Sequence, residues 1–166
     1  MKYKVFLSYS KEDTAKAKNI YQKLKKKGYL PYMAEVYPEP GTFLWERIKR
    51  EIEDSDCLVV LWTKEGAESQ YINQELGCAS AFKKPIISII NGGSKRVGVI
   101  EGFEYIPYNK KVNRRLLNRL SDLKHEKELL YERIDEPRYK RSNRIALAVM
   151  LIIITYYIIL LVTRSI

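Results

Sequence analysis

The six residues Cys57–Trp62 read CLVVLW, an unbroken apolar run in a chain of which 30% of the residues are charged. A strand with one solvated face alternates apolar and polar residues, so a run without alternation indicates a strand buried on both faces. Strands of this kind lie inside parallel sheets that helices cover on both sides. This run therefore predicts an α/β fold.

Strand-like and helix-like segments alternate over the first 109 residues. We expect strands at 2–9, 29–33, 57–62, 86–90 and 104–108, and helices at 14–27, 43–53 and 69–82. Pro31 places the second strand at an edge, because proline cannot donate a ladder hydrogen bond, and Gly28 ends the helix before it. The pattern predicts a flavodoxin-like, doubly wound sheet of five parallel strands.

Folds of this kind bind ligands beyond the carboxyl ends of the strands, where the strand order reverses beside strands one and three. Ser8, Tyr9 and Ser10 end the first expected strand, and Trp62 and Thr63 end the third. We expect Ser8, Tyr9, Ser10 and Trp62 to form walls of a ligand crevice, although Ser8 and Ser10 also suit a turn and Trp62 also suits the core. Ser10 or Asp13 is expected to cap the first helix.

The helix expected over Ser69–Phe82 carries a carboxylate on its apolar side. At about 100° per residue, Glu75 falls within an apolar face, which comprises Tyr71, Ile72, Leu76, Cys78, Ala79 and Phe82. A buried carboxylate is costly unless it is paired or has a function. Glu75 is therefore either the partner of a Lys or Arg or a catalytic acid.

Charge and cysteine content exclude several classes of protein. Of the net charge of +10, residues 1–109 hold only +3 (17 Lys and Arg against 14 Asp and Glu), so a nucleic-acid-binding domain is not expected. Cys57, Cys78 and the single His125 have no metal-ligand spacing, which predicts no metal site. Asn91–Ser94 lacks a phosphate-loop pattern, and the N-terminus lacks the apolar core of a signal peptide.

The C-terminal third is basic and then apolar. Residues 110–144 are expected to form a basic helical linker that could complete the domain at 1–109, and residues 145–162 carry no charge. About 18 apolar residues in a helix are just long enough to cross a bilayer. Segment 145–163 is therefore predicted to be a single transmembrane helix. The bases before it place the N-terminal domain in the cytoplasm.

Several of these residues together resemble the Toll/interleukin-1 receptor (TIR) domain, in its microbial NAD-cleaving branch. Val5–Asp13 (VFLSYSKED) is similar to the first-strand motif of that family, and Ser69-x-Tyr71-xxx-Glu75 resembles its Ser-x-Trp-xxx-Glu signature. Three further segments resemble parts of the family: the junction before strand two at 28–29, the loop after strand two at Pro40-Gly41, and the strand after the third helix at 84–87. The match covers about residues 3–109.

The resemblance implies cleavage of NAD+ at the nicotinamide–ribose bond, with Glu75 as the catalytic residue. The products would be nicotinamide and ADP-ribose or a cyclic isomer, with NAD+ as substrate and no further cofactor. Tyr71 would stack on the base, in the place where the family usually has Trp. The stretch 33–35 lacks the Asp that often ends strand two of the family.

The resemblance also implies gating by TIR–TIR self-association, in microbial antiviral signalling at the cell membrane. An alternative is a non-catalytic TIR adaptor that makes TIR–TIR contacts through the loop at 34–43. A third reading is a flavodoxin-like module for another nucleotide, but no glycine fingerprint for FMN or a dinucleotide is present. An adaptor has no need of Glu75 on an apolar face, so this residue discriminates between the alternatives.

Overall fold

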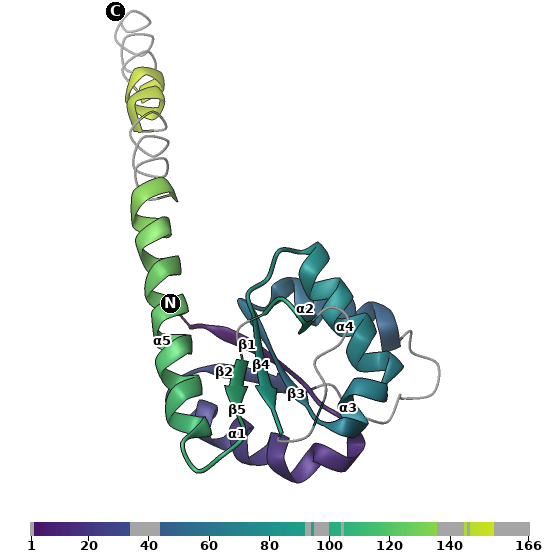
Figure 1. Cartoon of the computed structure of the whole chain (residues 1–166). Coiled ribbons are helices and arrows are strands. Elements are labelled where there is room, and N and C mark those ends of the chain that lie inside the picture. The colour runs from purple at the N-terminus through teal and green to yellow at the C-terminus, as the bar shows by residue number, and fades with distance from the viewer. Residues whose placement is uncertain are drawn as a thin grey trace, which may run out of the picture. The chain divides into compact units, whose positions relative to one another are not determined.

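A computed structural model describes residues 2–33, 44–91, 94, 100–103, 105–135, 145 and 147–154. Its centre is one sheet of five parallel strands in the order β2-β1-β3-β4-β5 (Figure 1). The strands are β1 (Lys4–Ser8), β2 (Leu30–Met33), β3 (Cys57–Trp62), β4 (Ile86–Ile90) and β5 (Tyr105–Pro107). The predicted doubly wound α/β sheet is confirmed, and β2 with its proline lies at an edge as expected.

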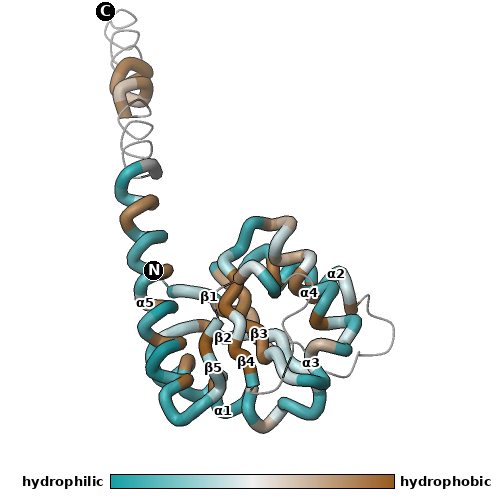
Figure 2. Tube along the Cα trace, in the orientation of Figure 1, coloured by the Kyte–Doolittle hydropathy of each residue, from teal (hydrophilic) through white to brown (hydrophobic). Residues whose placement is uncertain are grey.

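The order of the strands reverses between β1 and β3, which pair in parallel from Val5↔Cys57 to Ser8↔Val60. All six residues of β3 are buried, as its unbroken apolar sequence predicts. Figure 2 shows apolar strands at the centre of the domain and hydrophilic residues on the outer sides of the helices. The carboxyl ends of β1 and β3 therefore meet at the position where such folds bind ligands.

Helices cover both faces of the sheet (Figure 1). The helical segments are α1 (Thr14–Lys26), α2 (Leu44–Asp54), α3 (Lys64–Glu68), α4 (Gln70–Ala81) and α5 (Val112–Leu130), with short helical turns at Lys11–Asp13 and Tyr131–Asp135. α2 and α4 pack on one face, where they bury a core with Phe6, Leu58, Val60 and Trp62. α1 and the first part of α5 lie on the other face. Gly28, at a φ of 82°, follows α1 as the predicted helix stop.

The described chain divides into two compact units, Met1–Ser121 and Asp122–Ile166. The first unit holds the sheet and ends at Ser121, which is 12 residues beyond the domain boundary of 109 that the sequence suggests. The boundary between the two units falls within α5. Of the second unit's apolar run, Ile145 and residues 147–154 are described, and they are helical. Within the described residues, no helix has the length and apolar character needed to span a membrane.

Two predicted segments lie wholly or largely outside the described residues. The loop at 34–43, through which TIR–TIR contact is expected, is one of them. The other is segment 145–163, of which 146 and 155–163 are not described. The expected Asn91–Ser94 turn is described only at Asn91 and Ser94.

Candidate functional site

Glu75 lies on the buried face of α4, and its side chain is only 5% exposed. Ile72, Leu76 and Ala79 share this face, as the helical spacing predicts. Burial raises the pKa of Glu75 from 4.5 to about 7, and the nearby Ser8 hydroxyl opposes part of that rise. Among the described residues, no Lys or Arg is an ion-pair partner of Glu75 or lowers its pKa. The described part of the chain therefore offers no Lys or Arg for the alternative in which Glu75 is a structural ion-pair partner.

Two unpartnered hydroxyls lie on the same face of the sheet as Glu75. Ser8 of β1 and Ser88 of β4 are each 1% exposed, and both pair in register with Val60 of β3. Residues paired across parallel strands point to the same face, so Ser8 and Ser88 flank Val60 at roughly 10 Å from each other. Ser88 Oγ has no hydrogen-bond partner among the described residues. Ser8 Oγ is near enough to Glu75 to lower its pKa, but no contact within hydrogen-bond geometry is formed in this part of the chain. Orphaned polar atoms at 1% exposure are uncommon and call for a ligand or water.

Asp13 organises a second cluster beside the carboxyl ends of β1 and β3. Ser10 Oγ and Thr63 Oγ1 donate to Asp13 Oδ2 at 2.7 and 2.6 Å, and Lys16 Nζ donates to Oδ1 at 2.6 Å. Burial alone would raise the pKa of Asp13, but the hydrogen bonds from these three donors outweigh it and lower the pKa. The cluster ties the end of β1 to the end of β3 through a charged, fully partnered carboxylate.

The expected capping role of Ser10 and Asp13 is wrong. Neither side chain accepts a hydrogen bond from the backbone of the following helical turn. Asp13 lies within 3 Å of Thr63, a residue 50 positions away, so its oxygens are occupied by a tertiary contact. A local capping pattern is overridden when a buried donor from a distant segment reaches the same oxygen.

Tyr71 does not share the buried face of Glu75, and that part of the prediction is wrong. Its side chain is 67% exposed, whereas Ile72 beside it is 1% exposed. The buried stripe of α4 is centred between Ile72 and Ala79. At 100° per residue, Tyr71 points about 90° away from that centre. Any contact of Tyr71 with a ligand is at the surface of the domain.

The remaining predicted wall residues divide between the core and the crevice. Trp62 is 1% exposed and packs in the α2–α4 core, which favours its structural alternative. Ser10 is 6% exposed and occupied by Asp13. Tyr9 is half-buried. The structure thus brings Ser8 to Glu75, and Ser10 to the Asp13 cluster at the same end of the sheet.

Sequence reasoning missed Ser88, and it placed Thr63 at the end of the third strand without assigning it a role. Ser88 stands alone in the apolar strand Ile86–Ile90, and a single hydroxyl inside such a run was the available signal. Thr63 directly follows β3, where it donates to Asp13 and accepts a hydrogen bond from Gly66 N at 3.0 Å. Among the described residues, no cluster of His, Cys, Asp and Glu is placed to hold a metal ion.

The fold and this arrangement can be compared with those of known proteins. A sequence profile of the TIR domain matches residues 5–121, more than half of the chain. The chain belongs to the TIR domain family. The match continues to the end of the first compact unit, so the first part of α5 is part of the TIR domain.

Solved structures agree with this assignment at the level of the fold. The TIR domain of the Toll-related receptor TRR-2 from Hydra magnipapillata superimposes with a TM-score of 0.62 at 20% identity, over 70% of this chain and 97% of that one. The CMP N-glycosidase of Clostridium botulinum gives 0.52 at 22% identity, over 71% and 98%. A TIR-STING receptor from C. gigas gives 0.59 at 17%, over 70% of this chain and 39% of that one. No curated protein matches the sequence.

Proposed function

We propose that this TIR domain cleaves NAD+ at the bond between nicotinamide and ribose, with Glu75 as the catalytic carboxylate. The observation that carries the proposal is a 5% exposed glutamate with a pKa near 7, without a cationic partner in the described chain, whose pKa is influenced by Ser8 at the end of β1. Perturbed carboxyl groups with no structural partner are concentrated at functional sites. The Ser-x-Tyr-xxx-Glu pattern supports the same residue.

The chemistry needs a negative charge beside the ribose. When the C1′–N bond breaks, its electron pair leaves with the nicotinamide nitrogen, and positive oxocarbenium character develops on the ribose. A fixed carboxylate stabilises that charge, and it does so more strongly in a buried site than in water. Water that attacks C1′ and loses a proton gives ADP-ribose, while attack by a nucleophile of the same molecule gives a cyclic isomer.

Ser8 and Ser88 suit a role in holding the substrate. Their hydroxyls are buried on the face of the sheet that Glu75 covers and have no partner among the described residues. Ribose hydroxyls are donors and acceptors that would satisfy both serines. Tyr71, exposed one turn before Glu75, offers an aromatic surface for stacking of a base. The C. botulinum protein with this fold is a CMP N-glycosidase, a precedent for breaking an N-glycosidic bond on this scaffold.

We further propose that segment 145–163 anchors the domain in the cell membrane as a single span, with residues 1–144 in the cytoplasm. Anchoring would concentrate the domains in two dimensions and favour TIR–TIR self-association. An assembly-gated NADase at the membrane fits a role in microbial antiviral signalling. The self-association surface expected at 34–43 lies outside the described residues.

Release of nicotinamide from NAD+ by the full-length protein tests the proposal. We expect Glu75→Gln to reduce the rate by at least about 100-fold, the scale of losing one charge-stabilising group, while the fold is retained. Glu68→Gln, which alters an exposed carboxyl of α3, is the matched control and should keep the full rate. Because the carboxylate form is the active one, wild-type activity should rise with pH around 7.

The adaptor alternative makes the opposite prediction. If the protein is a non-catalytic adaptor, no nicotinamide is released even at high protein concentration, and Glu75→Gln leaves self-association unchanged. Undiminished release by the Glu75→Gln variant would also sink the catalytic assignment. Measuring nicotinamide release by the wild type and by Glu75→Gln therefore distinguishes the enzyme from the adaptor.

A further inference from the structure

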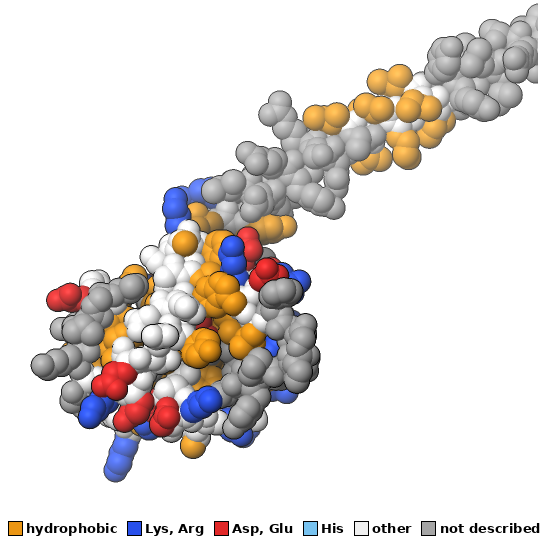
Figure 3. Space-filling view, turned by 90° about the vertical axis from the view of Figure 1, so that its right-hand side faces the viewer, with side chains coloured by type: hydrophobic (Ala, Val, Ile, Leu, Met, Phe, Trp, Pro, Cys, Tyr) orange, Lys and Arg blue, Asp and Glu red, His pale blue; other side chains and the backbone are white. Residues whose placement is uncertain are grey.

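Charge is distributed unevenly over the helices that cover the sheet. On one face, α1 and the first part of α5, to Ser121, hold eight Lys and Arg and no Asp or Glu. The remaining helices of this domain, α2 to α4, hold four Lys and Arg against seven Asp and Glu. Figure 3, which views the side of α2 and α4, shows acidic and basic side chains together. The domain therefore has a strongly basic side and a slightly acidic one.

Eight exposed cations lie on or directly before the two helices of the basic side. None of them has a hydrogen bond or ion pair from its side chain among the described residues. Lys16 and Arg119 are not in this set, because both have interactions within the chain. We call the set the basic face, and it comprises Lys18, Lys23, Lys25, Lys26, Lys110, Lys111, Arg114 and Arg115.

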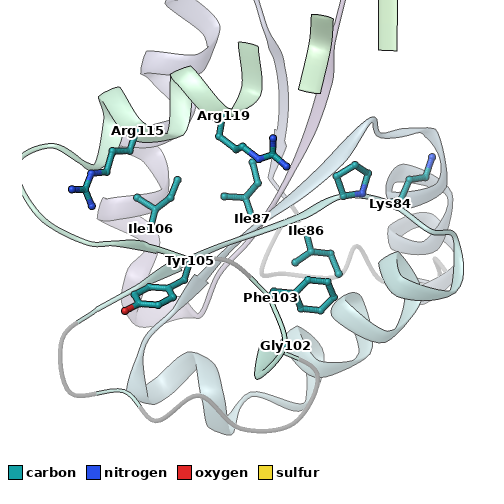
Figure 4. Close-up of a pocket in the computed structure, with 10 residues that line it drawn as sticks. Lys84, Ile86, Ile87, Gly102, Phe103, Tyr105, Ile106, Arg115 and Arg119 are labelled. Atoms are coloured by element: carbon teal, nitrogen blue, oxygen red, sulfur yellow. The ribbon is translucent and has the colours of Figure 1, made fainter. Parts of the chain in front are cut away.

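The basic face is spread over a surface and does not converge on one small anion. At the β5 edge, Arg115 and Arg119 point in different directions from α5 (Figure 4). Lys16 Nζ lies 5.7 Å from the centre of the Tyr108 ring, which places the start of α1 beside the segment that leads into α5. The cations of the two helices therefore belong to one continuous side of the domain.

α1 directs its lysines toward solvent. The helix buries one stripe, which comprises Ala17, Ile20 and Leu24. At about 100° per residue, three lysines fall within an arc of about 100° on the outer side of the helix: Lys18, Lys25 and Lys26. No aromatic residue of α1 is exposed. The outer side of α1 thus offers separate, strongly hydrated point charges, without rings on which bases could stack.

An anionic membrane surface is the partner that such a face fits best. Residues 149–154 of the same chain are 45–66% exposed and apolar, and we have proposed that their segment is a membrane anchor. A domain anchored in a bilayer meets the lipid surface at a high effective concentration. Each Lys or Arg close to anionic headgroups adds to the attraction, without a need for a shaped pocket.

We propose that the basic face binds the anionic phospholipid surface of the membrane in which the C-terminal segment is anchored. The proposal rests on the anchor at 145–163 and is independent of NAD+ cleavage. α4, which carries Glu75, packs on the opposite face of the sheet (Figure 1). Binding through the basic face therefore leaves the side of α4 open to a substrate from solution.

The full-length protein with Val149→Asp and Ile153→Asp tests the basic face without the anchor. The two acids disrupt the apolar run and add no cation that could itself bind lipid. In buffer without detergent, we expect this parent protein to float with vesicles that contain phosphatidylserine and not with vesicles of phosphatidylcholine alone. Adding Lys18→Gln, Lys25→Gln and Lys26→Gln should lower the partition coefficient about 100-fold, since each lysine contributes about a factor of five.

Three exposed cations of α2 and α3 provide the matched control. Lys49→Gln, Arg50→Gln and Lys64→Gln change the net charge of the parent protein by the same amount. Because they lie outside the basic face, we expect the partition coefficient to fall by less than about threefold. High salt should release the parent protein from the vesicles, since it screens exposed charges. Circular dichroism checks that each variant is folded.

Three outcomes overturn the proposal. The first is an equal loss of binding in the two triple variants, which would make net charge responsible and not the basic face. The second is equal binding to vesicles with and without phosphatidylserine. The third is no binding to the anionic vesicles, and binding to duplex RNA through the same lysines would then identify nucleic acid as the partner. Loss of nicotinamide release with retained vesicle binding would contradict the NAD+ proposal and leave this one intact.

Discussion

Glu75 makes the stability of the domain depend on pH in an unusual direction. Between its ordinary pKa of 4.5 and its raised pKa of about 7, the folded state holds more protons than the unfolded state. Stability therefore falls as the pH rises through this window. The shift corresponds to about 3 kcal/mol of lost stability above pH 7. A buried acid at this position is tolerated at a cost, as is common at functional sites.

Replacing Glu75 with Gln should remove this cost. At pH 8.5 we expect the variant to be more stable than the wild type by up to about 3 kcal/mol, and at pH 4 we expect the two to be nearly equal. Urea unfolding followed by the fluorescence of the buried Trp62 measures both values. The control Glu68→Gln should differ from the wild type in its free energy of unfolding by the same small amount at both pH values. A variant less stable than the wild type at pH 8.5 would contradict the raised pKa of Glu75.

Asp13 should have the opposite influence. Its pKa is lowered by its hydrogen bonds, so its charged form stabilises the fold above the ordinary pKa of 3.8, and this contribution is lost as the pH falls through the lowered pKa. Asp13→Asn should lower the free energy of unfolding by about 2–4 kcal/mol at pH 7, because three donors lose a charged acceptor.

Comparison with a substitution of its salt-bridge partner separates burial from charge pairing in the Asp13 cluster. Lys16 is 34% exposed at its side chain, so Lys16→Met should cost less than about 1 kcal/mol. Equal losses for Asp13→Asn and Lys16→Met would show that the salt bridge, and not the buried hydroxyl network, carries the stability. Chemical denaturation at pH 7 gives both numbers.

The side chains show where sequence reasoning ends. The burial of Glu75 follows from helical spacing alone, since residues 72, 75, 76 and 79 form one stripe. The exposure of Tyr71 and the contact between Asp13 and Thr63 depend on how distant segments pack, and no local pattern encodes them. The burial of Glu75 could be predicted from the sequence, but the exposure of Tyr71 and the hydrogen-bond partners of Asp13 could not.

Among the elements, α3 is held in place by a close backbone approach. A Cβ atom on Gly66 would lie 2.8 Å from the carbonyl oxygen of Leu61 and 3.3 Å from Thr63 Oγ1. Thr63 also caps α3 by accepting from Gly66 N. Gly66→Ala should therefore displace the helix start and destabilise the domain by about 1–3 kcal/mol.

Gly77 provides the matched control for this substitution. It is an exposed glycine inside α4, and a Cβ there would meet nothing within 4 Å. Gly77→Ala should stabilise the domain by about 0.5–1 kcal/mol, because alanine loses less backbone entropy in a helix. Thermal unfolding of the two variants gives shifts of opposite sign. If both variants gain stability, the tight packing of α3 on β3 is wrong.

Elements with a strong pattern are predicted to their boundaries, and weak ones are not. β3 and β4 begin and end where their apolar runs do, because burial on both faces leaves no polar residue inside the strand apart from Ser88. α3 was missed, since five residues reading KEGAE have no apolar periodicity and depend on the capping by Thr63 and the packing of Gly66. Its existence is a tertiary effect.

At the scale of the whole molecule, the apolar run after the TIR domain needs a covering. The exposed fraction is 45–66% for Ile145, Leu147 and every residue from 149 to 154. Figure 3 shows apolar side chains along this segment and no charged one among them. A surface this apolar is unfavourable in water. Lipid would cover it on all sides, and this physical requirement supports the proposed anchor at 145–163.

Charged substitutions within this run test the anchor. An arginine at the centre of a membrane helix costs about 2.5–3.5 kcal/mol, so Val149→Arg with Ile153→Arg should move most of the full-length protein from the membrane to the soluble fraction. The control pair Val149→Leu and Ile153→Leu keeps the apolar surface and should remain bound. Flotation with phospholipid vesicles, followed by extraction at alkaline pH, measures the fraction retained. If wild-type protein stays in the supernatant without detergent, another protein surface covers this run and the anchor is wrong.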